Sequence, residues 1–126
     1  MKEKIILVLV FSLITILSAQ DVPEWSWAFN AGGSNIDQGN SIVTDDSGNI
    51  YVAGRFSDTA TFGSTTITAS GSDDVFVAKY DESGNLVWIN QAGGTSGDVA
   101  TGIALDYLGN VCVTGYIQGT ANFGTS

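Results

Sequence analysis

The chain contains 126 residues, of which 4 are basic and 13 are acidic, so its formal net charge is −9. An acidic chain repels nucleic acid and anionic membrane surfaces, and we expect it to bind neither. The sequence has no histidine and a single cysteine, Cys112, which excludes an internal disulfide, a Ser-His-Asp or Cys-His nucleophile and a histidine metal site.

The N-terminus has the layout of a secretory signal peptide. Lys2 and Lys4 precede an apolar run from Ile5 to Leu17, and the small residues Ser18 and Ala19 follow it. A helix of this length rises about 20 Å, which is less than the roughly 30 Å of a membrane's hydrocarbon core. We therefore expect cleavage during export, with an uncleaved membrane anchor as the alternative. The 2 basic and 12 acidic residues that remain after cleavage have a net charge of 2 − 12 = −10.

The rest of the chain contains an internal repeat. Residues 27–65 align without a gap on residues 88–126, an offset of 61 residues, and 15 of the 39 aligned pairs are identical. Ordinary amino-acid usage gives about two or three identities by chance. We therefore divide the chain into a signal peptide (1–19) and a repeat region (20–126). The first copy covers 27–87, and the second, incomplete copy covers 88–126.

Short β-rich runs separated by Gly, Asn, Asp and Ser predict an all-β region. The predicted strands, in chain order, are Trp25–Asn30, Ser41–Thr44, Ile50–Phe56, Asp74–Tyr80, Leu86–Gln91, Gly102–Leu105 and Val111–Ile117. One period therefore holds four strands. The first predicted strand corresponds to the last strand of a period, so the repeat region opens with an orphan outer strand. We interpret Cys112, within the last strand, as a small buried hydrophobe.

Three predicted turns share the pattern Asp-x-x-Gly-Asn, at residues 45–49, 81–85 and 106–110. The Asp side chain can accept hydrogen bonds from N–H groups of the turn, and Gly can adopt the positive φ that closes a hairpin. The oxygen-bearing side chains of residues 45, 47 and 49 are also spaced as in a calcium loop, although the bidentate glutamate of such a loop is missing. We favour a hairpin turn, with calcium binding as the alternative.

Several runs are apolar on both faces, among them residues 50–53 and 75–78. Such runs indicate a sheet that is covered on both sides, as in the packed blades of a β-propeller. We therefore predict β-propeller blades of four antiparallel strands, with about one and three-quarter blades present. Repeats of this kind bury their core only against neighbours, so we expect a fragment of a longer protein that needs further blades. Closure by self-association of a short chain is the alternative.

Three segments carry a family resemblance. Trp27-x-x-x-Ala31-Gly32-Gly33, the segment from Asp45 to Gly54, and Thr59-Ala60-Thr61-Phe62-Gly63 resemble the bacterial β-propeller repeat often called the SBBP repeat. The resemblance continues through residues 73–88 and covers essentially all of residues 25–126. It implies a propeller fold in a large secreted or surface protein of bacteria. It implies no fixed activity, because propellers host many unrelated functions.

The remaining polar motifs favour structural roles. The glycine-rich segments 32–34 and 93–97 lack the lysine and helix of a phosphate loop. Asp37 and Asp98 follow these segments, and we expect them to accept hydrogen bonds from loop N–H groups. The pair Asp73 and Asp74 has the composition of a glycan-cleaving acid and base, but we interpret Asp73 as the end of a loop before a strand. Aromatic residues that recur in both copies are interpreted as core residues: Trp27, Trp88, Phe62 and Phe123.

The sequence predicts a non-catalytic binding or structural module of a secreted or cell-surface bacterial protein, without catalytic, cofactor-binding or metal residues. We expect an unknown protein or glycan as its ligand, no nucleic acid, and no membrane insertion after signal cleavage. One alternative is the scaffold part of an extracellular polysaccharide-acting enzyme whose active site lies outside this fragment. Another is a repeat array that assembles cell-surface or gliding machinery.

Overall fold

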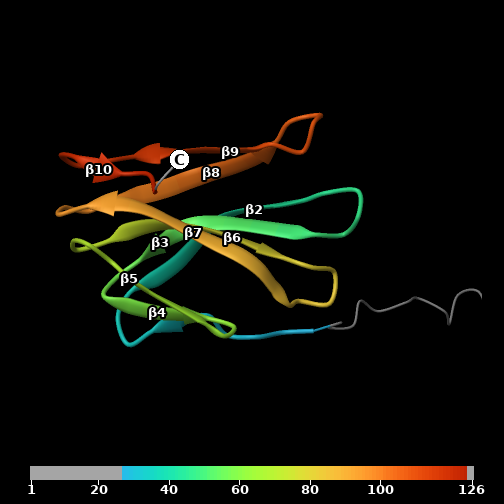
Figure 1. Ribbon diagram of the computed structural model, residues 1–126, viewed down its shortest axis with the longest axis horizontal. Helices are drawn as coiled ribbons and strands as arrows, with labels where there is room; N and C mark the ends of the chain where they lie inside the picture. The colour runs from blue at the N-terminus through green and yellow to red at the C-terminus, as the bar shows by residue number, and fades with distance from the viewer. Residues whose placement is uncertain (1–26, 125–126) are drawn as a thin grey trace, which may run out of the picture.

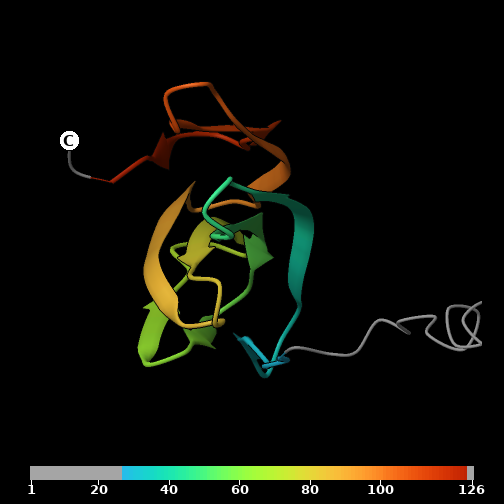
Figure 2. The ribbon, with the colours of Figure 1, turned by 90° about the vertical axis from the view of Figure 1, so that its right-hand side faces the viewer.

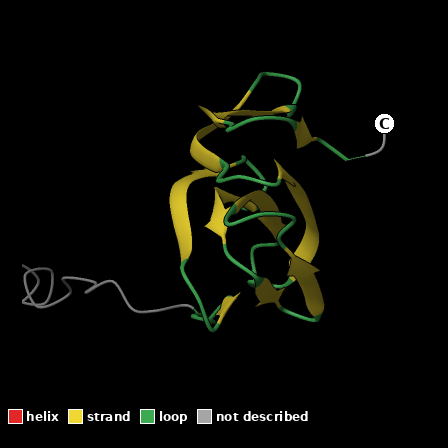
Figure 3. Ribbon diagram, turned by 90° about the vertical axis from the view of Figure 1, so that its left-hand side faces the viewer, coloured by secondary structure: helices red, strands yellow, loops and turns green. Residues whose placement is uncertain are grey.

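The computed structural model describes residues 27–124. The secondary structure within this range consists of β-strands, without a helix (Figure 3). This confirms the all-β prediction. None of the described residues belongs to a helix with the length and apolarity that a membrane crossing requires. The strands are β1 (Gly32–Gly33), β2 (Asp37–Thr44), β3 (Ile50–Phe56), β4 (Thr59–Phe62), β5 (Thr65–Thr68), β6 (Asp74–Tyr80), β7 (Leu86–Gly94), β8 (Val99–Leu105), β9 (Val111–Tyr116) and β10 (Ala121–Asn122).

The central sheet is the predicted four-stranded antiparallel blade. Its order is β2-β3-β6-β7, and the short β10 extends it beyond β7 (Figure 1). The β3 and β6 strands pair along their full length, from Ile50 opposite Tyr80 to Phe56 opposite Asp74. The strand β2 begins four residues before the predicted Ser41, because a bulge between Gly39 and Ser41 interrupts the alternation that marks a strand in the sequence.

The hairpin β4–β5 was not predicted as strands. It pairs Thr59 with Thr68 and Phe62 with Thr65, and β1 joins it on the other side of β4. Along β4 the two threonines are exposed, whereas Ala60 and Phe62 are buried. This alternation over four residues was the signal in the sequence. This signal is weak, because the run is short and contains no large aliphatic residue.

The predicted orphan strand at Trp25–Asn30 is wrong for the residues that the structure describes. Residues 27–31 form no strand, and 25 and 26 lie outside the described residues. The equivalent run in β7 pairs with β6, whereas residues 27–31 have no ladder partner among residues 27–124. Side chains hold the segment instead, because Trp27 Nε1 donates to the Glu82 carbonyl over 3.0 Å.

After β7, the second copy continues with a separate two-stranded sheet, β8–β9. The register of β8 against β9 repeats that of β2 against β3, including a bulge between Ala100 and Gly102 at the position equivalent to Gly39 and Ser41. The two bulges contact each other, since Asn40 Nδ2 donates to the Ala100 carbonyl over 2.8 Å. Figures 1 and 2 show this sheet on the opposite side of the central sheet from β4 and β5.

Both faces of the central sheet are covered, as its apolar runs predicted. The hairpin β4–β5 covers one face, and the cluster there contains Phe56, Ala60, Phe62, Phe76, Ala78 and Tyr80. The strand β8 covers the other face through a smaller cluster of Ala53, Val75 and Ala100. The cover on the first face comes from the same repeat copy, and the cover on the second face comes from the next copy.

We expect Phe76→Ala to lower the free energy of unfolding by about 3–5 kcal/mol, because it empties the centre of the larger cluster. Urea unfolding followed by circular dichroism measures the loss. Ile42→Ala is the control, because Ile42 lies in the same sheet but is 66% exposed, and we expect a change within about 0.5 kcal/mol. Equal losses in the two variants would contradict the assigned core.

Candidate functional site

The three Asp-x-x-Gly-Asn turns have the same hydrogen-bond network. In the first turn, Asp45 Oδ1 accepts from the N–H groups of Ser47 and Asn49, both at 2.9 Å, and Asp45 Oδ2 accepts from Asn49 Nδ2 at 2.8 Å. The networks around Asp81 and Asp106 match it. The glycine of each turn has a φ of +78° to +82°. These contacts confirm the hairpin-turn interpretation.

The electrostatics of the turns follow from these contacts. The side-chain amide of the final Asn lowers the pKa of Asp45, Asp81 and Asp106 below the ordinary value of 3.8, and backbone N–H groups add to the effect. A carboxylate in this setting is a hydrogen-bond acceptor for its own turn. A calcium loop would instead direct such oxygens at the ion. Residues 27–124 contain no cluster of three or more carboxylate or thiol groups with the geometry of a metal site.

Asp37 and Asp98 each hold a glycine pair near the start of their own copy. Asp37 Oδ2 accepts from the Gly33 N–H over 2.7 Å, and Asp98 Oδ2 accepts from the Gly94 N–H over the same distance. This confirms the role predicted for both residues. Asp98 is fully buried, and its second oxygen accepts from the Gln118 N–H over 2.9 Å.

Asp73 and Asp74 have separate structural partners. Asp73 forms an ion pair with Arg55 over 3.2 Å and accepts a hydrogen bond from the Ser57 hydroxyl. Asp74 begins β6, as the sequence indicated, and is fully buried, with one oxygen accepting from the Ser70 N–H over 3.0 Å. The sequence pattern did not reveal the partner Arg55, because it lies 18 residues away on a neighbouring strand.

The two copies differ in burial at positions that β6 and β7 cover in the first copy only. Tyr51 is 5% exposed, because Trp88 of β7 packs against its ring and Lys79 of β6 lies 5.0 Å from the ring centre. Its counterpart Cys112 is exposed, so the interpretation of Cys112 as a buried hydrophobe is wrong. The prediction that Phe62 and Phe123 are core residues is confirmed for Phe62, which is 3% exposed. It is wrong for Phe123, which is 74% exposed. Trp27 and Trp88 are half-buried.

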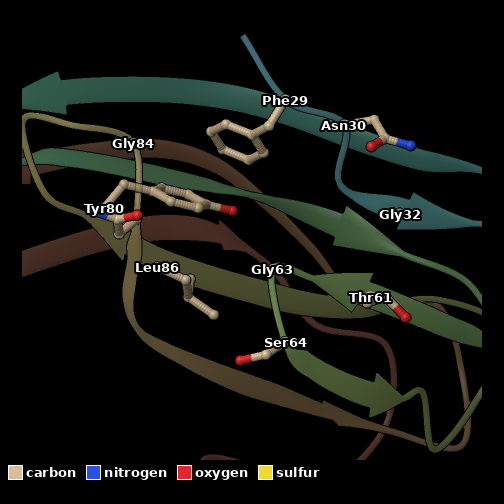
Figure 4. A pocket seen from close by; sticks show the side chains of 10 residues that line it. Phe29, Asn30, Gly32, Thr61, Gly63, Ser64, Tyr80, Gly84 and Leu86 are labelled. Carbon is tan, nitrogen blue, oxygen red and sulfur yellow. The ribbon is translucent and has the colours of Figure 1, made fainter. Parts of the chain in front are cut away.

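A cavity of about 560 Å³ lies between the hairpin β4–β5 and the turn that joins β6 to β7. Figure 4 shows the ring of Phe29 beside that of Tyr80, and the two ring centres are 4.7 Å apart. The described lining residues include Thr61, Ser64 and Asn85 but no carboxylate and no amine. The cavity therefore offers hydroxyl, amide and aromatic contacts without an acid–base pair from this part of the chain.

We expect the turns to make the stability of the protein sensitive to acid. Their depressed pKa values mean that the stabilising contribution is complete above the ordinary value of 3.8 and is lost as the pH falls through the lower values of the folded state. Asp81→Asn should lower the melting temperature at neutral pH and weaken its dependence on acid pH. The control Glu82→Gln removes one charge from the same turn and should change neither the melting temperature at neutral pH nor its dependence on acid pH. Equal acid sensitivity in both variants would contradict the assignment.

We also expect calcium to leave the melting temperature unchanged, because the turn carboxylates already accept hydrogen bonds within the turns. Thermal unfolding in calcium and in chelator measures this. A rise of several degrees in calcium that disappears in Asp45→Asn would instead support calcium loops.

Comparisons with known proteins identify the repeat. The family model described as a beta-propeller repeat, SBBP, matches residues 30–55 and 87–124. An uncharacterized WD repeat-containing protein from Acanthamoeba polyphaga mimivirus is 34% identical over 113 residues. That match covers 75% of this chain and 8% of the relative. No solved structure was found to match. The repeated blade, its turns and the family match together show that the chain belongs to the SBBP family of β-propeller repeats.

Proposed function

We propose that the chain is a non-catalytic binding or structural β-propeller module of a secreted or cell-surface bacterial protein. Residues 1–19 are the export signal, and they lie outside the described residues. After cleavage no segment inserts into a membrane. The chain spans only 8% of the viral relative's length, and we propose that it acts together with further copies of the repeat.

The observation that carries this proposal is the structural use of carboxylates at equivalent positions of the repeat. One set accepts hydrogen bonds within hairpin turns, and another holds the glycine pair near the start of each copy. Catalysis by two carboxylates needs unlike groups placed on either side of a substrate. Matching groups with matching partners in each copy support a scaffold.

The charge of the module favours a protein or glycan partner over nucleic acid. Within residues 27–124 the basic side chains are Arg55 and Lys79. Arg55 contacts Asp73 and Gln38, and Lys79 lies over the Tyr51 ring. This part of the chain therefore presents no basic patch for a phosphate backbone. The cavity with exposed hydroxyl, amide and aromatic groups offers the contacts that neutral glycans or polar peptide segments require.

The alternative is a scaffold part of an extracellular enzyme that acts on polysaccharide, with an active site outside this chain. The separate cavity between the two copies, about 410 Å³ in volume, also has no carboxylate among its described lining residues. The acid and base of such an enzyme would therefore come from other blades. The two proposals differ in what the whole native protein does to a polysaccharide.

The native protein should be found in the medium or be cleaved by protease added to intact cells, and a variant lacking residues 5–17 should remain inside. The purified native protein should retain its ligand without releasing reducing ends from polysaccharides. Retention inside the cell would contradict the proposed location. Release of reducing ends by the native protein, but not by this chain, would support the enzyme-scaffold alternative.

A further inference from the structure

One of the three Asp-x-x-Gly-Asn turns differs from the other two at its tip. The tip consists of an acidic residue and a serine in the turns at 45–49 and 81–85, but of Tyr107 and Leu108 in the turn at 106–110. Tyr107 is 94% exposed and Leu108 is 70% exposed. Tight turns favour small polar residues. The fold therefore gives no reason for two large apolar side chains at this tip.

The exposure of this tip is independent of which neighbouring copy is present. The second copy has the first copy on one side, and Tyr107 and Leu108 are exposed beside it. The first copy has the second copy on its other side, and the counterparts Asp46 and Ser47 are exposed there. The tip position therefore faces solvent with a neighbour on either side. This distinguishes it from the position of Phe123, whose counterpart in the first copy is buried by β6.

Hydrogen bonds within the turn fix the backbone that carries the two side chains. Asp106 Oδ1 accepts from the N–H groups of Leu108 and Asn110, both over 2.8 Å, and Asp106 Oδ2 accepts from Asn110 Nδ2 over 2.7 Å. The Gly109 N–H donates to the Asp106 carbonyl over 3.0 Å. A partner therefore orders only the side chains of the tip. Since tyrosine has few rotatable bonds, the entropic cost of binding is small.

The end of the molecule that carries this tip is acidic. Figure 1 shows the turns after β2, β6 and β8 at the same end, and a Cβ atom at Gly48 would lie 3.3 Å from Glu82 Cβ. The three turns contain five carboxylate side chains and no basic one. The aspartate that begins each turn has a lowered pKa, because the side-chain amide of the final Asn donates to it. Lys79, which lies over the Tyr51 ring, offsets one of these charges.

An apolar tip with an acidic surround favours one class of partner. A glycan needs hydrogen-bonding groups beside the aromatic ring, whereas the residue next to Tyr107 is Leu108. A bilayer is disfavoured, because two side chains hold a protein there only weakly and anionic lipid repels the carboxylates. Nucleic acid is repelled by the same charges. A protein surface with an apolar pocket and a rim of lysine or arginine complements both the tip and its surround.

We propose that the turn at 106–110 docks on another protein, with Tyr107 and Leu108 in an apolar pocket of that partner. The carboxylates of the three turns lie opposite lysine or arginine side chains at the rim of the pocket. The tip provides the buried anchor, and the charges speed association and select the partner. The inference rests on the proposed function as a binding module, and it names a basic protein surface as the partner of this end of the molecule.

The first turn supplies a matched variant for the test. Tyr107→Asp combined with Leu108→Ser gives the third turn the sequence of the turn at 45–49, which forms the same hydrogen bonds. The melting temperature of this tip variant should therefore stay unchanged. Any loss of binding in the variant then reports the two side chains and not the fold.

The partner is sought with the whole native protein in its own cells. A benzophenone amino acid replaces Tyr107 or, as the control, Asp46. The protein that crosslinks from position 107 and not from position 46 is purified, and its affinity for the native protein and for the tip variant is measured by calorimetry. We expect the tip variant to bind about tenfold more weakly or worse. We also expect slower association as the salt concentration rises.

Three results would overturn the proposal. They are the absence of a crosslink specific to position 107, equal affinities of the native protein and the tip variant, and sedimentation of the native protein, but not the variant, with vesicles of phosphatidylcholine or phosphatidylglycerol. The last result would assign the tip to lipid. None of them alters the outcome of the export and reducing-end measurements, so a failure here is distinguishable from a failure of the proposed function.

Discussion

Burial of both faces of the central sheet is the constraint on which the rest of the structure depends. The inner strands β3 and β6 carry apolar residues on both sides, and neither face can be left in water without losing its hydrophobic stabilisation. The hairpin β4–β5 covers one face from within the same copy. The other face is covered by β8 of the next copy, through Ala100 against Ala53 and Val75. One copy is therefore not a folding unit by itself, and contact between successive copies is part of its core.

Comparison of the two copies distinguishes residues whose environment is set by local contacts from residues whose environment depends on a neighbouring strand. Asp37 and Asp98 make the same hydrogen bond in their copies, because the glycine N–H that each carboxylate accepts from lies four residues earlier in the same copy. Phe62 and Phe123 differ in exposure, because the cover of Phe62 comes from β6. The same reasoning applies to Tyr51 and Cys112. Identity of sequence thus gives identity of environment only where the contacts are local.

This distinction also explains what the sequence could predict. The four strands of the blade, the three turns and the roles of Asp37 and Asp98 follow from residue patterns within a few positions. The only local sign of the hairpin β4–β5 in the sequence is the alternation of Thr59 and Thr61 with Ala60 and Phe62, which are buried in the structure. The ion pair of Arg55 with Asp73 depends on strand register across 18 residues, which local patterns do not specify. The absence of a strand at residues 27–30 likewise depends on a partner, since a β-rich run becomes a strand only beside another strand.

The contact between copies is asymmetric, because the two copies contribute different surfaces to it. Ile103 of the second copy packs near Ala53 on the central sheet, whereas its counterpart Ile42 in the first copy is 66% exposed. The two copies thus use different surfaces at their contact: the second copy contributes β8 with Ile103, and the first contributes the face of the central sheet that carries Ala53. Repetition of such a head-to-tail contact either closes into a ring or continues as an open array. Closure into a ring also removes the unpaired edges that invite aggregation. In either arrangement, the carboxylates of each copy hold its turns and its glycine pair, so the contact between copies joins units whose loops are already fixed by their own hydrogen bonds.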